Sequence, residues 1–484
     1  MYQGFTKKLT ASLIVAALGG ATFSAQAEQE FDIIVKLKNQ NSPFSISAAQ
    51  QQNMKASSAN PVAYHKAQAN IRKNQVNKFV SQAGIQPKFV YSNTYYGFAA
   101  TVNQSQMNAL QRNPNVEAVY RDKEYHLLDS QKTRFNNNYG AYKNRRQLVE
   151  WPQSVPQGPA DSGSVNSSYK GAGQHVYVID SGIDADHKDI AGNLGLSYAP
   201  EFCFRPGDTE LCPSPYSDDN GHGTHVAGTI GALDNDIDSL GVAPEATIHA
   251  VKVCSAAGSC PGSAILAGLN WSVFDMLGHG QPAVANLSLG GGDDEAAGTC
   301  TEEGYEGDHF VAEAYCNAAH QGMVIVVAAG NSSADAAGFS PAKFNSTIAV
   351  SSYVSYDADT GEAAFNDFSN WGEGANDWSS LPSGVITIAA PGNQIESLNR
   401  THANTRLSGT SMASPAVAGG AALVLEKYPQ SMDFSALQNV RQMLVDNATI
   451  PLSVVIDNAT DTDDVYNQEF PHAEGLLNLE FLDE

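Results

Sequence analysis

Apolar and polar residues alternate in two different ways along this chain. Between residues 31 and 122, short runs rich in Ile, Val and aromatic residues are separated by polar stretches with spaced apolar positions. From Gly173 onward, short apolar runs alternate with longer helical stretches. The first pattern predicts a small α+β unit, and the second predicts a mostly parallel sheet covered by helices on both faces.

The pattern also locates individual elements. In the first unit we expect strands at residues 31–39 and 115–122, two strands within 87–102, and helices at 60–82 and 103–113, the latter ending before Pro114. In the second unit we expect strands at residues 175–180, 247–253, 283–289, 322–329, 346–352 and 386–390. The polar, Asn-rich and basic segment 129–150 is typical of an exposed linker.

Charge separates the same two units. The 484-residue chain has a net charge of −24 and a pI of about 4.7, which argues against a nucleic-acid-binding protein. Residues 28–150 carry 16 Lys and Arg against 8 Asp and Glu, whereas residues 151–484 carry 9 against 43. This asymmetry indicates distinct units that attract each other. The alternative is that the acidic surface serves only solubility.

The N-terminus has the pattern of a secretory signal peptide. Lys7 and Lys8 precede an apolar stretch at residues 9–23, and Ala25-Gln26-Ala27 forms a small-x-small cleavage site. We therefore expect cleavage after Ala27, a secreted protein, and no membrane attachment after cleavage. The alternative is an uncleaved anchor, which the short, Gly-interrupted apolar stretch does not favour.

The cysteines fit an oxidising compartment, since their number is even and all follow Trp151. Six cysteines allow 15 pairings, of which pairing between neighbours is the simplest. A zinc site is the rival interpretation, but there is no CxxC spacing and no clustered His. The six residues are Cys203, Cys212, Cys254, Cys260, Cys300 and Cys316.

Four polar residues stand at predicted strand ends or helix starts. Asp180 ends the apolar strand within VIDSGID, His222 lies in NGHGTHVAGTI, Asn331 ends VVAAGN, and Ser411 opens the apolar helix of SGTSMASP. Sites in open α/β sheets gather at the carboxyl ends of strands. A serine becomes a nucleophile when a His removes its proton and an Asp orients that His. The amide of Asn331 is suited to hydrogen-bond a developing oxyanion.

Each of the four also has an ordinary structural interpretation. Asp180 alone fits an Asx turn, and Ser411 alone fits a helix N-cap. His222 and Asn331 alone fit loop positions. The combination of all four in the order Asp, His, Asn, Ser is what favours nucleophilic catalysis.

These four stretches resemble the signature motifs of the subtilisin-like serine protease family (peptidase S8). The resemblance runs from about Trp151 to the closing GLLNLE, and the first unit resembles the family's inhibitory propeptide through FDIIVKL, YYGFAATV and NVEAVYRD. It implies a three-layer α/β catalytic domain preceded by a small α+β, ferredoxin-like propeptide. Residues 293–308 and 372–384 look like insertions relative to compact members of the family.

The resemblance assigns roles to individual residues. It implies the triad Asp180, His222 and Ser411 with Asn331 in the oxyanion hole, whereas His225 is expected to pack. An extended peptide is expected to pair with backbone on both sides of the cleft. The implied substrate-binding residues are Gly258, Ser259, Cys260, Ser288, Leu289 and Gly290.

A calcium site follows from the same resemblance. ALDNDIDSLGVAP resembles the family's calcium loop, and oxygen-only ligands suit a hard cation. The alternative is an acidic turn that only faces water. The implied ligands are Asp189, Leu233, Asn235, Ile237 and Ser239.

We therefore expect a secreted serine endopeptidase that forms an acyl-enzyme on Ser411 and processes its own precursor. The expected segments are a signal peptide (1–27), an inhibitory propeptide (28–128), a linker (129–150) and a catalytic domain (151–484). Its partners would be polypeptide substrates and its own propeptide, which acts as intramolecular chaperone and inhibitor. We expect a monomer with structural calcium and no organic cofactor.

Two other classes of protein are the rivals. An α/β-hydrolase esterase has the order Ser, acid, His and the motif G-x-S-x-G, whereas this chain has the order Asp, His, Ser. A non-catalytic adhesion or inhibitor protein would be recognised by a lost triad residue, and all three are present.

Overall fold

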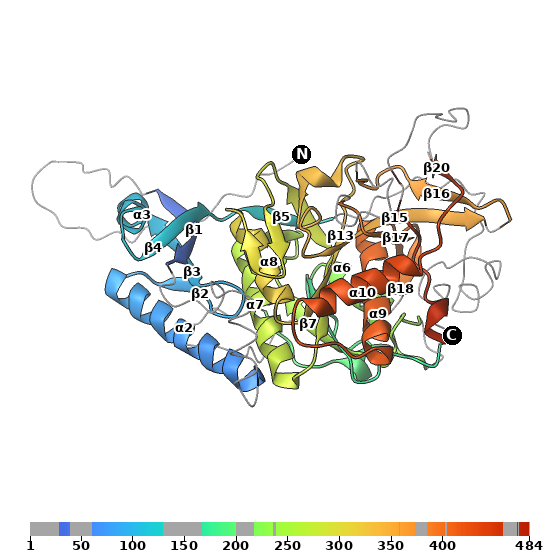
Figure 1. The fold of residues 1–484 in the computed structure, drawn as a ribbon, viewed down its shortest axis with the longest axis horizontal. Coiled ribbons are helices and arrows are strands. Elements are labelled where there is room, and N and C mark those ends of the chain that lie inside the picture. Colours follow the sequence, from blue (N-terminus) through green and yellow to red (C-terminus); the bar gives the residue numbers. More distant parts are fainter. Residues whose placement is uncertain are drawn as a thin grey trace, which may run out of the picture.

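The computed structural model describes residues 29–38, 61–128, 167–199, 217–235, 239–357, 359–372, 385–401, 404–457, 472 and 474–483. The expected signal peptide, the linker 129–150, and most of the segment 372–384 lie outside these ranges. Two units lie side by side, and β5 extends from the first into the second (Figure 1). Over the described ranges, no helix has both the length and the apolar character needed to cross a bilayer.

The first unit is a four-stranded antiparallel sheet in the order β2-β3-β1-β4 with two helices, the ferredoxin-like arrangement that was predicted. Helix α3 begins with a capping box, in which Asn103 and Gln106 exchange side-chain and backbone hydrogen bonds. The elements are β1 (Glu30–Leu37), α2 (Pro61–Ala83), β2 (Pro87–Tyr91), β3 (Gly97–Asn103), α3 (Gln104–Gln111) and β4 (Val116–Arg121).

Both faces of this sheet are buried. Ile33 and Val35 of β1 point into a core with the two helices of the unit, whereas Ile34 points into a core that it shares with the second unit. Successive side chains of a strand alternate between faces, so β1 serves both cores with adjacent residues. The second unit therefore covers a sheet face that would otherwise be exposed.

The second unit is built on a sheet in the order β20-β16-β15-β13-β9-β6-β7, with β17 also paired to β15. The pairs from β7 to β15 and the β15–β17 pair are parallel, as the apolar runs predicted. The strands are β6 (His175–Asp180), β7 (Thr247–Lys252), β9 (Ala283–Leu287), β13 (Met323–Ala328), β15 (Ile348–Asp357), β16 (Glu362–Asn366), β17 (Ile388–Pro391) and β20 (Ser453–Asp457).

Helices cover both faces of this sheet (Figure 1). Along β6, Val176 and Val178 face one core together with α6, α9 and α10, and Tyr177 and Ile179 face the other with α7 and α8. The three-layer prediction is confirmed. The helices are α6 (His222–Gly231), α7 (Gly262–His279), α8 (Phe310–Ala319), α9 (Thr410–Lys427) and α10 (Ser435–Asp446), with short 3₁₀ turns η3 (Ala191–Asn193), η4 (Ala336–Gly338) and η5 (Glu480–Asp483).

A smaller sheet joins the two units. Strand β5 (Glu124–Leu127) belongs to the first unit but lies between β8 (Ser259–Pro261) and β10 (Leu289–Gly292), antiparallel to both. Strand β14 (Phe339–Ser340) completes this sheet. The sequence did not predict β5, because its residues EYHL have no partner strand within their own unit.

Polar contacts fix the first unit on α7. The side-chain oxygen of Asn270 accepts hydrogen bonds from the backbone N–H groups of residues 92–94, at 2.7–3.3 Å. The carboxylate of Asp122 accepts the backbone N–H of Ser263, at 2.9 Å, in the first turn of α7. An anion is favoured there because the helix N-terminus carries unpaired N–H groups and a partial positive charge.

The predicted insertion at 293–308 contains a hairpin of β11 (Thr299–Thr301) and β12 (Gly304–Glu306). A disulfide from Cys300 to Cys316 ties it to α8. Its acidic character therefore belongs to an ordered part of the fold. The remaining strands, β18 (Ile395–Leu398) and β19 (Asn404–Leu407), form a separate antiparallel pair.

Candidate active site

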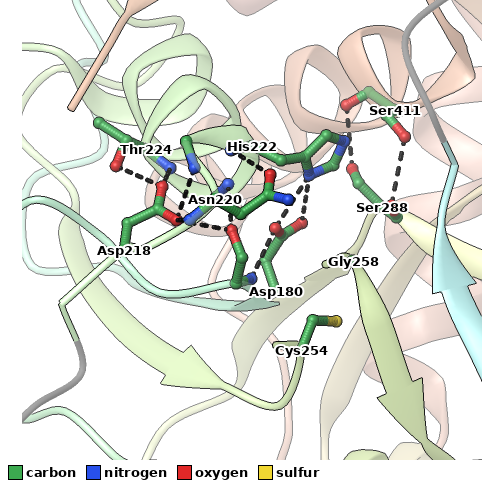
Figure 2. A network of polar contacts seen from close by, with 12 residues as sticks. Asp180, Asp218, Asn220, His222, Thr224, Cys254, Gly258, Ser288 and Ser411 are labelled. Carbon is green, nitrogen blue, oxygen red and sulfur yellow. Dashed lines mark hydrogen bonds and ion pairs between the residues drawn. The ribbon is translucent and has the colours of Figure 1, made fainter. Parts of the chain in front are cut away.

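The predicted acid and base are in contact. Asp180 is the last residue of β6, and His222 is the first residue of α6. Nδ1 of His222 lies 2.9 and 3.0 Å from the two carboxylate oxygens of Asp180, and both side chains are buried. Because a carboxylate can only accept, Nδ1 carries the proton and the lone pair lies on Nε2. In Figure 2 the His222 ring lies between Asp180 and Ser411.

The loop before His222 is held by a residue that the sequence analysis did not single out. One carboxylate oxygen of Asp218 accepts hydrogen bonds from Ser181 Oγ and the backbone N–H of Gly221, at 2.9 and 2.8 Å. The other oxygen accepts from the backbone N–H and the hydroxyl of Thr224, at 2.9 and 2.7 Å. Asp218 thus caps α6 and joins it to the end of β6. Its position just before a predicted helix was a usable signal for such a cap.

Close backbone packing fixes the distance between these two elements. A Cβ on Gly223 would lie 2.1 Å from the carbonyl oxygen of Gly182 and 3.1 Å from an oxygen of Asp180. No side chain fits there without displacing the backbone. Gly223 therefore allows α6 to approach the carboxyl end of β6 closely enough for the Asp180–His222 contact.

Ser411 is the second residue of α9 and is fully buried. Its Oγ lies 3.1 Å from the carbonyl oxygen of Leu128 and 3.2 Å from that of Ser288, and one proton can serve either oxygen. The hydroxyl of Ser288 donates in turn to the carbonyl of Ser411, at 2.9 Å (Figure 2). The end of β9 and the start of α9 are joined by these two bonds.

The amide of Asn331 has a defined orientation. Its Oδ1 accepts hydrogen bonds from the backbone N–H and the hydroxyl of Thr410, at 2.9 and 2.8 Å. The NH₂ group must therefore face the other way, and Nδ2 lies 3.4 Å from the carbonyl oxygen of Leu128. The role of Thr410 in orienting this amide was missed, although the residue lies within the SGTSMASP motif.

The six predicted substrate-binding residues lie along the two sides of β5. Tyr125 and His126 pair with Cys260 and Ser259 on one side, and His126 and Leu127 pair with Gly290 and Leu289 on the other. The N–H of Leu127 donates to the carbonyl of Gly258, at 2.9 Å, and Ser288 contacts Ser411 as described. A strand inserted in this way presents the next carbonyl, that of Leu128, to Ser411 and Asn331.

His225 does not contact Asp180 or Ser411 through any described hydrogen bond. Its Nε2 hydrogen-bonds the carbonyl of Ile395, at 2.9 Å, and its side chain is fully buried. Burial lowers the pKa of His225 to about 3, against the opposing effect of that hydrogen bond. A neutral, packed imidazole agrees with the packing role expected for it.

Two residues of the predicted calcium loop contact Asp189, whose side chain is buried. Oδ2 of Asp189 accepts the N–H of Ser239, and its backbone carbonyl accepts the N–H of Leu233, both at 2.8 Å. Asn235 lies between these two loop residues in sequence, and Ile237 lies outside the described residues. A fully buried Asp tied to both ends of a loop fits the oxygen-only donor set of a hard cation.

One disulfide lies at the edge of the cleft. Cys254 and Cys260 are bonded, with their Cα atoms 4.2 Å apart, and Cys260 pairs with Tyr125 of β5. The expected bond between Cys203 and Cys212 lies outside the described residues. The disulfide closes the loop that leads from the end of β7 into β8, so it fixes one wall of the cleft.

Comparison with known proteins gives matches to both units. Residues 171–475 match the family model described as "Subtilase family", and residues 33–128 match that described as "Peptidase inhibitor I9". The chain is 35% identical over 333 residues to Subtilisin DY of Bacillus licheniformis. The matched region covers 68% of this chain and 97% of that protein. It is 34% identical over 343 residues to "Extracellular serine proteinase" of Thermus sp. (strain Rt41A), covering 70% and 68% respectively.

Among solved structures, the chain is similar to "Crystal structure of a cold adapted subtilisin-like serine proteinase". The two are 30% identical, the match covers 65% of this chain and 91% of that chain, and the TM-score is 0.47.

The cleft disulfide generates a prediction. Replacing both Cys254 and Cys260 by Ser should lower the free energy of unfolding by about 2 kcal/mol, since the closed loop is short. It should also raise KM for peptides long enough to pair with β8, because an unpinned β8 must be ordered upon binding. Calorimetry and kinetics on long and short peptides measure the two effects. Equal KM ratios for long and short peptides would contradict the second expectation.

Proposed function

The chain belongs to the subtilase family of serine endopeptidases and carries an I9 propeptide, and from this premise we propose that it is secreted as a precursor that Ser411 cleaves. In this proposal Ser411 is the nucleophile, His222 the general base, and Asp180 the residue that orients the imidazole. Asn331 donates to the oxyanion. The product is a mature endopeptidase that hydrolyses polypeptides through an acyl-enzyme.

The proposed reaction follows from the protonation states. Nε2 of His222, which bears the lone pair, takes the proton of Ser411 as Oγ attacks the carbonyl carbon of the substrate. The carbonyl oxygen becomes an oxyanion, which Nδ2 of Asn331 stabilises. His222 then gives the proton to the leaving amine, an acyl-enzyme remains on Ser411, and water releases it by the same steps in reverse order. Asp180 stabilises the imidazolium each time it forms.

One observation carries the proposal. The carbonyl oxygen of Leu128 is 3.1 Å from Ser411 Oγ and 3.4 Å from Asn331 Nδ2, at the end of a strand paired on both edges. This is the position that an acyl group of a substrate would occupy. We therefore propose that the precursor is cut between Leu128 and Asp129, so that residues 28–128 become the inhibitory propeptide.

The other segments are proposed from the sequence and from relatives. The relative from Thermus is called extracellular, which supports removal of residues 1–27 as a signal peptide and export of the remainder. Residues 129–150 would then form an N-terminal extension of the mature protein before the catalytic domain at 151–484. Disulfides at Cys254–Cys260 and Cys300–Cys316 agree with an oxidising compartment.

We also propose that calcium is held by Asp189, Asn235 and the backbone carbonyls of Leu233, Ile237 and Ser239. The position of Asp189 supports this proposal, since its buried carboxylate contacts the loop at Ser239 and carboxylate and carbonyl oxygens are the ligands that calcium prefers. Calcium would supply structural stability and no chemistry.

The nucleophile is tested by substitution. Ser411→Ala should abolish turnover and leave the precursor uncut, whereas the exposed control Ser431→Ala should process normally. Edman sequencing of the mature control should begin Asp-Ser-Gln-Lys. Asn331→Leu should lower kcat by about 10²–10³, a magnitude measured on a subtilisin. Self-processing by purified Ser411→Ala protein would show that the nucleophile is another residue.

Calcium is tested by its removal. A cation that binds only the folded chain stabilises it by mass action, so a chelator should shorten the half-life of activity at elevated temperature. Asp189→Asn should shorten the half-life in calcium and should reduce the effect of the chelator. Identical half-lives in chelator and in excess calcium would refute the site.

The electrostatic attraction of the two units is tested by salt. Lys36 of the first unit contacts Glu313 of the second at 2.6 Å, and the net charges of the two parts of the sequence are opposite. Association of added propeptide with mature enzyme should therefore slow as ionic strength rises, because salt screens the attraction. Stopped-flow measurements between 0.05 and 0.5 M salt provide the test, and a constant association rate would contradict it.

A further inference from the structure

The residue before strand β5 also reaches the wall of the cleft. Lys123 places its Nζ 2.9 Å from Oδ1 of Asp293, the residue that follows β10. We propose that Asp293 forms a subsite for a basic side chain, Lys or Arg, at the sixth residue before the cleaved bond of polypeptide substrates. This inference rests on the proposed function, since it takes β5 as a guide to how substrates bind.

The position follows from counting along the strand. If Leu128 is the residue whose carbonyl is attacked, then Leu127 is the second residue before the bond, Tyr125 the fourth and Lys123 the sixth. Residues 124–126 pair with β8, and residues 126 and 127 pair with β10, so a substrate of the same length is held in the same register. Its sixth side chain would therefore arrive at Asp293.

The carboxylate of Asp293 is held ready for such a ligand. Its Oδ2 accepts hydrogen bonds from His309 Nε2, at 2.8 Å, and from Ser340 Oγ, and lies 3.3 Å from Lys343 Nζ. Its Oδ1 accepts the N–H of Glu295, at 3.2 Å, and the ammonium of Lys123. Oδ2 is thus used only to fix the side chain, whereas Oδ1, besides accepting the N–H of Glu295, is turned to the residue in the cleft.

The proton on His309 is fixed by its helix. Nδ1 of His309 accepts the N–H of Ala312 in the first turn of α8, so Nε2 must carry the proton that is donated to Asp293. The histidine therefore orients the carboxylate without adding a full positive charge. A ligand ammonium does not have to displace a protonated imidazole.

Charge and burial favour a cation at Oδ1. The Asp293 side chain is fully buried, whereas Lys123 is 38% exposed. Burial raises the pKa of Asp293, but hydrogen bonds from Ser340, Lys123 and His309 outweigh burial and keep its pKa below the ordinary value. Lys343 is engaged by the backbone carbonyls of Asp293 and Glu295, at 2.7 and 2.5 Å. A preorganised, ionised carboxylate costs little further entropy when it binds an ammonium group.

The neighbouring position gives a contrast. Glu124, the fifth residue before the bond, contacts the hydroxyl of Ser259 on the opposite wall of the cleft. A hydroxyl can hydrogen-bond either an acidic or a neutral side chain, so it selects less by charge. The carboxylate of Asp293, by contrast, favours a cation over an anion.

The experiment uses mature enzyme and peptides based on residues 123–130, KEYHLLDS. The first residue is Lys, Ala or Glu, and a further peptide has Ala first and Lys in place of His126, which is exposed. We expect kcat/KM to fall about five-fold from Lys to Ala, the range of a partly exposed ion pair, and to fall further with Glu. Lys at the third residue before the bond, the position of His126, should not restore kcat/KM. This peptide distinguishes binding at the subsite from general attraction to the negatively charged enzyme.

Variants then assign the effect to one carboxylate. In Asp293→Asn the Lys-to-Ala ratio should approach one, and in the matched control Glu303→Gln, an exposed acid of the same insertion, it should stay near five. The ratio does not depend on the fraction of folded enzyme. If Asp293→Asn does not fold, the peptide series on the unaltered enzyme still tests whether a basic side chain is preferred at the sixth residue before the bond.

Different results would contradict the subsite and the proposed function. A ratio of one in the unaltered enzyme, or a ratio that persists in Asp293→Asn, would overturn the subsite. Calorimetric binding of the product peptide KEYHLL and its Ala counterpart, which requires no catalysis, is measured in parallel with the same expected five-fold ratio in Kd. Failure to cleave any peptide, with that binding ratio intact, would overturn the proposed function and support the subsite.

Discussion

The alignment of β6, β9 and β13 in one parallel sheet is the constraint on which the site depends. Val178 pairs with Asn286, and Leu287 pairs with Val327, so the carboxyl ends of the three strands emerge at one edge. Asp180 lies two residues after Val178, and Ser288 lies two residues after its partner Asn286, so the two residues are level with each other. Residues distant in sequence are thereby brought to the start of α9 without any long side chain having to reach across the cleft.

Buried polar groups then convert this alignment into fixed orientations. Asp218 joins the start of α6 to the end of β6, Thr410 turns the Asn331 amide, and Ser288 bonds the carbonyl of Ser411. Each bond uses a donor or acceptor that would be costly to bury unpaired, so these residues stabilise the fold while they orient the site. Side chains also satisfy buried backbone groups where the two units meet. Asp122 accepts the N–H of Ser263, and Asn270 accepts the N–H of Ser92.

Much of this arrangement could be predicted from the sequence, for identifiable reasons. The apolar runs that become β6, β9 and β13 are buried on both faces, so their composition reveals them, and Asp180, Asn331 and Ser411 stand where those runs or the next helix meet Gly-rich turns. By contrast, β5 consists of four residues of mixed polarity that pair only with strands 130 or more residues away. Local patterns carry no information about such pairing. The bond between Lys123 and Asp293 was unpredictable for the same reason, since it depends on the register of β5.

Strand β5 is bonded along both of its edges, and this has a consequence for which proteins can be degraded. A polypeptide that replaces it must expose both rows of its backbone N–H and C=O groups over several consecutive residues. Helices and interior strands of folded proteins have already used these groups, so they must open locally before they can enter. The rate at which a native protein is digested would then reflect the free energy of its own local unfolding as much as its amino-acid sequence. With substrates bound as proposed, the cleft would select targets by conformational stability before any side chain is recognised.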